Sequence, residues 1–201
     1  MGSIKVQHKS HIPKVMFICT VSRPDPSRDF DGKIGIWRVC VIKEEQRTTG
    51  RHQNGKEYAV DIAIDSEYYQ EWYGHELLPT IKEKMPWLES SKVIVQQDGA
   101  SPHMGKGTEE KLNRVGKDGG WNIQLVRQPA QSPDLNVFDL GFFACLKSKI
   151  WRERFGTIDD LVEGVQRLFG EYEPETLERV WQSILKRYNQ VLTRPGGGRF
   201  R

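Results

Sequence analysis

Four short apolar runs constrain the fold of this 201-residue chain more than any other feature of its sequence. They span residues 14–22, 33–43, 92–97 and 121–127, and each has the length of a buried strand rather than of a helix. The first two runs are separated by a loop rich in proline and aspartate, so we expect them to pair in antiparallel fashion. Polar residues at 43–56 predict a surface loop, which can include a small hairpin at Asn54-Gly55.

Helical patterns occupy most of the remaining chain. Asp65 is predicted to cap a helix whose aromatic residues recur at helical spacing up to Ile81, with a bend at Pro79. We interpret this aromatic row as a core-facing stripe rather than as a platform for stacking bases. Further helices are predicted to span 108–115, 137 to about 154, a segment capped at 157–160, and a last segment that starts at Pro174. Strands early, strands and helices alternating in the middle and helices at the end indicate an α/β or α+β fold with a mixed sheet.

Composition sets broad limits on function. Hydrophobic residues at 37% predict a packed core, and the net charge of +3 is a weak argument for nucleic acid by itself. Three cysteines without C-x-x-C spacing suit a reducing compartment. The sequence contains neither an apolar stretch of about 18 residues nor an N-terminal apolar signal region, so we expect a soluble intracellular protein with no membrane span.

Two carboxylates stand where the backbone is predicted to be fixed. Asp98 ends the third apolar run, at the place where open α/β sheets put their sites, although Asp98-Gly99 is also a common turn dipeptide. Asp139 stands three residues after Asn136, which suits a helix-capping pair equally well. His103 could act as an acid/base group or metal ligand, but a histidine held by hydrogen bonds within its loop is favoured. Local sequence alone therefore favours structural roles.

Two longer motifs change this interpretation. The segment 97–103 (QDGASPH) followed by 131–139 (QSPDLNVFD) closely resembles the catalytic core of mariner-like transposases of the DDE/D superfamily. The segments 14–19, 30–37 and 139–143 resemble the plant and oomycete branch of that family. The resemblance covers nearly the whole chain.

The resemblance implies a ribonuclease-H-like fold, a mixed five-stranded sheet flanked by helices. It also implies a nuclear protein that acts on transposon ends and target DNA, with a homodimer as one expected assembly. Three carboxylates in that family bind two Mg²⁺ ions, or Mn²⁺, for phosphodiester hydrolysis and strand transfer. By motif position Asp98 is the second carboxylate and Asp139 the third, each both catalytic and metal-binding, whereas Asp134 is not carried over. Gly99 departs from the asparagine often found there.

We identify neither the family's first carboxylate and its strand nor the family's amino-terminal helix-turn-helix DNA-binding region in this sequence. In the family that strand is central, between the strand 14–22 and the strand that ends at Asp98, so its loss is expected to split the sheet into two-stranded pieces. The expected organisation is a polar segment 1–13, an incomplete ribonuclease-H-like core 14–155, C-terminal helices 156–193 packing on the core, and a tail 194–201.

The leading expectation is a fragment of a transposase catalytic domain that is inactive alone. One alternative is a gene-model fragment whose missing exon restores the first aspartate. The other is a non-enzymatic nucleic-acid-binding or assembly module, which would use the basic residues Lys147, Lys149, Arg152 and Arg154.

Overall fold

The computed structural model describes residues 15–44, 55, 57–98 and 107–193. The segments 1–13 and 194–201, nearly all of the predicted hairpin at Asn54-Gly55, and His103 lie outside the described residues. The fold is mixed α/β, as expected, and a ribonuclease-H-like sheet is not formed by the described strands.

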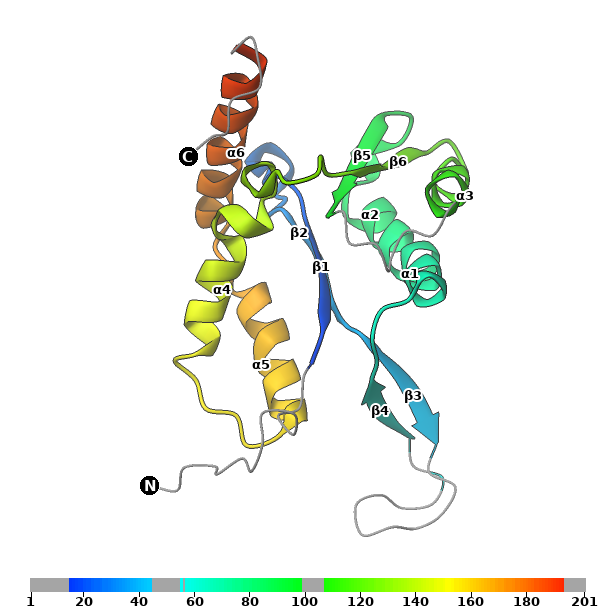
Figure 1. Cartoon of the computed structure of the whole chain (residues 1–201), viewed down its shortest axis with the longest axis vertical. Helices are drawn as coiled ribbons and strands as arrows, with labels where there is room; N and C mark the ends of the chain where they lie inside the picture. Colours follow the sequence, from blue (N-terminus) through cyan, green and yellow to red (C-terminus); the bar gives the residue numbers. More distant parts are fainter. Residues whose placement is uncertain (1–14, 45–54, 56, 99–106, 194–201) are drawn as a thin grey trace.

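Six described strands form three separate two-stranded sheets (Figure 1). The first sheet pairs β1 (Phe17–Val21) with β2 (Lys33–Arg38) in antiparallel fashion, as predicted. The second pairs β3 (Cys40–Glu44) with β4 (Glu57–Asp61), also antiparallel. The third pairs β5 (Lys92–Gln97) with β6 (Asn122–Arg127) in parallel. In the described chain β1 and β5 therefore belong to different sheets, as expected if a strand between them is lacking.

The helices mostly begin where the sequence predicts. The first helical segment comprises α1 (Ser66–Trp72), a π-helical stretch (Tyr73–Leu77) and α2 (Leu78–Lys84). The Asp65 carboxylate accepts from the Tyr68 backbone N–H at 2.8 Å, which confirms the predicted cap. Beyond it lie α3 (Thr108–Val115), α4 (Phe143–Ile150), α5 (Ile158–Gly170) and α6 (Pro174–Thr193). Short 3-10 turns cover 26–28, 86–88 and 133–135.

Two predictions about these elements are wrong, and one strand was not predicted. The run 33–43 is two strands, because at the fully buried Val39 the chain leaves the first sheet and enters the second. Strand β4 was not predicted; it is short, only its three central residues are apolar, and it is only partly buried. The helix expected over 137–154 is a π-helical turn (Phe138–Phe142), interrupted at Gly141, followed by an α4 that ends at Ile150.

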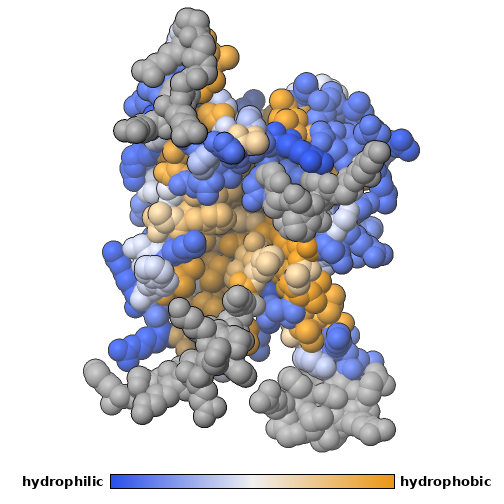
Figure 2. Space-filling view, viewed as in Figure 1, coloured by the Kyte–Doolittle hydropathy of each residue, from blue (hydrophilic) through white to orange (hydrophobic). Residues whose placement is uncertain are grey.

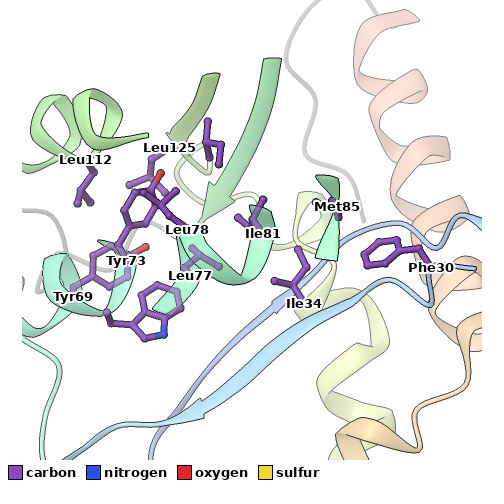
Figure 3. Close-up of a cluster of buried hydrophobic side chains, with 12 residues drawn as sticks. Phe30, Ile34, Tyr69, Tyr73, Leu77, Leu78, Ile81, Met85, Leu112 and Leu125 are labelled. Carbon is purple, nitrogen blue, oxygen red and sulfur yellow. The ribbon is translucent and has the colours of Figure 1, made fainter. Parts of the chain in front are cut away.

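The hairpin β1–β2 lies between two hydrophobic clusters. Ile18 and its partner Trp37 pack on the first cluster, which joins α1, α2, α3, β5 and β6 (Figure 3). Cys19 and its partner Ile36 project to the other face and pack on the second cluster, formed by the 138–142 turn, α4, α5 and α6. The aromatic residues Tyr69, Trp72 and Tyr73 are buried in the first cluster, so the stripe faces the core as predicted.

Two basic side chains connect these layers. Lys33 on β2 is 9% exposed, and its ammonium donates to the backbone carbonyls of Gly170, the last residue of α5, and Tyr172, and pairs with Asp31. The Arg38 guanidinium forms a two-pronged ion pair with Asp61 at 2.7 and 2.9 Å, which fixes the end of β2 to β4. This pairing raises the pKa of Arg38. Within the described ranges, no helix combines the length and apolar character needed to cross a bilayer.

Candidate carboxylate site

Asp98 and Asp139 line one small cavity, although forty residues (99–138) separate them in the sequence. Asp98 directly follows β5, and Asp139 lies in the π-helical turn that precedes α4. The cavity has a volume of about 440 Å³, and the segment 127–131 forms the rest of its lining. Both aspartates are exposed, so ions and larger ligands can reach them from solvent.

The third sheet fixes the position of Asp98. Beyond the last residue pair of β5 and β6, the backbone N–H of Gln128 donates to the carbonyl of Gln97 at 2.8 Å. From α1, the buried Tyr69 hydroxyl donates to the side-chain oxygen of Gln97. Burial raises the pKa of Tyr69, and the nearby Tyr73 and Asp98 raise it further, so the hydroxyl remains protonated. The residue before Asp98 is therefore fixed by its backbone and by its side chain.

A chain of side-chain hydrogen bonds fixes the turn that carries Asp139. The side-chain amide of Gln128 donates to the carbonyl of Ser132 at 2.6 Å, and the Asn136 side-chain amide donates to the Gln128 side-chain oxygen at 3.0 Å. The Asn136 side-chain oxygen then accepts from the backbone N–H of Phe138 at 2.9 Å. Asn136 thus caps the turn, as predicted.

Asp139 does not complete a capping box with Asn136. The backbone N–H of Asn136 donates to the carbonyl of Pro133 at 3.1 Å instead. In the parts of the chain that the structure describes, no hydrogen bond or ion pair engages the Asp139 carboxylate. Its position at the cavity is therefore set by the turn, and its oxygens remain available to a ligand.

The carboxylate oxygens at this site are donors of the kind that a hard divalent cation prefers. Carboxylate oxygens are suitable ligands for Mg²⁺, which normally keeps several water ligands when few carboxylates bind it. Among residues 15–44, 55, 57–98 and 107–193, no group of three or more histidine, cysteine, aspartate or glutamate side chains is placed to hold a metal ion. Asp98 and Asp139 are thus two carboxylates at one cavity, without a third such group among the described residues.

Arg127 is a cavity residue that the sequence analysis missed. It is the last residue of β6, and its guanidinium Nε lies 3.2 Å from the Glu109 carboxylate on α3. The signal was present in the sequence, because parallel strands end at the same edge of a sheet and Arg127 ends the strand next to the one before Asp98. A guanidinium beside two carboxylates gives the cavity a group that binds phosphate well.

The four basic residues considered for nucleic acid do not share one helix face. Lys147 and Lys149 lie two positions apart on α4, which places their side chains on roughly opposite sides of the helix. Lys147 is exposed, whereas Lys149 is half-buried, with its ammonium 5.9 Å from the centre of the Tyr172 ring. Arg152 and Arg154 are exposed in the segment that follows α4.

We compared the chain with known protein families and with curated proteins. No protein-family model matches the chain, and no curated protein matches its sequence.

Proposed function

We propose that this chain derives from the catalytic domain of a mariner-like DNA transposase, with Asp98 and Asp139 as two of its three metal-binding carboxylates. The observation that supports this most directly is their shared cavity of about 440 Å³, lined by residues from the ends of two parallel strands and from a fixed turn. Open α/β sheets place their ligands at this kind of edge. The proposal includes a nuclear location and DNA as the substrate.

The residues have distinct roles in this proposal. Asp98 and Asp139 hold a Mg²⁺ or Mn²⁺ ion, and Arg127 binds a phosphate oxygen of the DNA backbone. When bound, the ion supplies Lewis-acid chemistry for phosphodiester cleavage. Because the motifs of this chain provide two of the three expected carboxylates, we propose that it has little or no strand-cleaving activity alone.

Metal binding tests the site without requiring activity. Calorimetric titration of the purified chain with Mn²⁺ should detect one ion, and Asp98→Asn or Asp139→Asn should weaken binding at least about tenfold, about 1.4 kcal/mol. Asp134→Asn is the matched control, because Asp134 is partly buried in the same loop and does not line the cavity. Equal binding by wild type and both site variants would refute the assignment.

A cleavage assay tests the second part of the proposal. A labelled duplex that carries a terminal repeat is incubated with the chain and Mg²⁺, beside Asp98→Ala. We expect no cleavage above the level of this variant. Cleavage well above it would show that two carboxylates suffice.

A non-enzymatic nucleic-acid-binding or assembly module is the second candidate. The exposed side chains of Lys147, Arg152 and Arg154, close together in sequence at the end of α4, favour it. Such a module would bind DNA without metal, with a log–log salt slope of about −0.9 for each neutralised phosphate. Replacing the three residues by glutamine should then reduce the slope by about 2 to 3. An unchanged slope would exclude them.

A further inference from the structure

The two candidate carboxylates are anchored to different hydrophobic clusters. Asp98 follows β5, whose Val93 and Val95 pack on the first cluster. Asp139 lies in the turn whose Phe142 is buried in the second cluster. Figure 2 shows hydrophobic residues gathered over the middle of the molecule, where Figure 1 places the β1–β2 hairpin between α1–α3 and α4–α6. The separation of the two aspartates therefore depends on how the two clusters are held against each other.

Gln96 on β5 links the two segments directly. Because side chains alternate along a strand, Gln96 projects from the face opposite to Val95 and away from the first cluster. Its side-chain amide donates to the backbone carbonyl of Leu135 at 2.8 Å. Gln96 lies two residues before Asp98, and Leu135 lies four residues before Asp139. One hydrogen bond thus joins the two segments that carry the candidate ligands.

Tyr188 on α6 orients this amide. The Tyr188 hydroxyl donates to the side-chain oxygen of Gln96 at 3.0 Å and lies 3.5 Å from the Leu135 carbonyl. Since the amide oxygen faces Tyr188, the NH₂ group is the end that faces Leu135. Tyr188 stands one turn after Ile184, which is 2% exposed, and both pack in the second cluster. Burial raises the pKa of Tyr188, so its hydroxyl stays protonated and able to donate at neutral pH.

Two other contacts bear on this separation but act differently. Apolar contact through the β1–β2 hairpin is non-directional, so it holds the clusters together without fixing the distance between two chosen atoms. The hydrogen bond from Asn136 to Gln128 runs to the segment that connects β6 to the turn. The bond from Gln96 joins β5 to the turn independently of that segment, and a hydrogen bond constrains both distance and direction.

We propose that Gln96 and Tyr188 are positioning residues that hold Asp139 at its distance from Asp98, so that the C-terminal helix α6 controls the metal affinity of the site. This inference rests on the proposed function, because it takes the two aspartates as metal ligands. Neither Gln96 nor Tyr188 binds the ion itself in this arrangement. If their hydrogen bonds are lost, the turn can move away from β5, and an ion at Asp98 then loses its second protein ligand.

Calorimetric titration with Mn²⁺ tests the two residues. Tyr188→Phe removes one hydroxyl, and Gln96→Met keeps an unbranched side chain but loses both hydrogen bonds, so each should weaken Mn²⁺ binding about threefold to tenfold. The double variant should bind as Gln96→Met does, because both changes break one network. The matched controls are Tyr68→Phe, whose hydroxyl donates to the Arg38 carbonyl, and Gln124→Met on the same face of the β5–β6 sheet. Both controls should bind Mn²⁺ as the wild type does.

Amide hydrogen exchange gives a second readout that needs no metal. The backbone N–H groups of Phe138 and Leu140 donate to Asn136, so their exchange reports on the turn that carries Asp139. Both should exchange at least about threefold faster in Tyr188→Phe and in Gln96→Met. The N–H of Leu125, which donates to Asn113 at 2.6 Å, should exchange at the wild-type rate, because it belongs to the first cluster.

The possible results separate this inference from the proposed function. Wild-type Mn²⁺ affinity in both variants would overturn the positioning role and leave the metal assignment intact. If the wild type itself does not bind Mn²⁺, the proposed function fails, and exchange at Phe138 and Leu140 decides whether Gln96 and Tyr188 hold the turn. Unchanged exchange there would overturn the inference, as would faster exchange at Leu125 as well, since that would show a general loss of stability.

Discussion

Replacing Lys33 by methionine should destabilise the protein by about 2–4 kcal/mol. The Lys33 ammonium donates to the carbonyls of Gly170 and Tyr172, the second at 3.0 Å, and hydrogen bonds to a charged group contribute about 1.5–3 kcal/mol each. Its ion pair with Asp31, at 3.1 Å, adds less because Asp31 is 43% exposed. Methionine recovers part of the loss by filling the space of the lysine stem.

Thermal and urea unfolding of the purified chain measure this change. A loss of 2–4 kcal/mol corresponds to a fall in Tm of about 5–15 °C for a domain of this size. The exposed Lys117, for which no side-chain hydrogen bond or ion pair is found in the described structure, supplies the control, and Lys117→Met should stay within about 0.5 kcal/mol of wild type. If Lys33→Met lost less than about 0.5 kcal/mol, the inferred link between β2 and the end of α5 would be wrong.

Three further predictions concern a cap, a thiol and an ion pair. Thr157→Ala should cost about 1 kcal/mol in urea unfolding, because Thr157 accepts from the Asp160 N–H at 3.0 Å in a capping box; an unchanged urea midpoint would contradict this. Burial raises the pKa of Cys19, so iodoacetamide at pH 8 should label it much more slowly in the native protein than in urea, and equal rates by mass spectrometry would contradict the burial. Arg23 lowers the pKa of Glu178, so the pair stabilises the fold above the unfolded glutamate pKa of about 4.3 and loses this effect as pH falls through the lower folded value. Arg23→Gln should therefore lower the urea midpoint slightly at pH 7 and leave it almost unchanged at pH 2, and an equal effect at both would contradict the pairing.

Elements with local signals were predictable from the sequence. β5 is a short apolar run that ends at Gln97, α3 has acidic residues in its first turn, and α6 starts at Pro174 and carries a regular apolar stripe. The sequence signal for each of these elements lies within its own residues. The predictions therefore succeeded for these elements.

Elements set by distant contacts were not predictable in the same way. Val39 is apolar like its neighbours, and only its hydrogen bonds to Met16 and Ile62 show that one apolar run serves two sheets. Strand β4 is formed by pairing with β3, since its own residues are partly exposed and mixed in character. Such features require knowledge of the partner strand.

The candidate site was predictable only through longer motifs. The local sequence around Asp98 is typical of a turn, and that around Asp139 is typical of a helix cap. In the structure Asn136 caps its turn without Asp139. That both aspartates line one cavity depends on the parallel pairing of β5 with β6 and on the turn after it. Arg127 reaches the cavity for the same reason, so it could be found once the pairing was known.

The position of the β1–β2 hairpin has a consequence for how the protein unfolds. Both hydrophobic clusters pack on this one hairpin, with Ile18 on one side and Cys19 on the other. If the hairpin unfolds, both clusters are exposed to water. The helices α5 and α6 and the helices α1 and α2 are thereby joined into one cooperative unit despite the separate sheets. The described residues of the sheet β3–β4 belong to neither cluster, so this sheet should open at lower free energy than the clusters once its Arg38–Asp61 ion pair to β2 is broken.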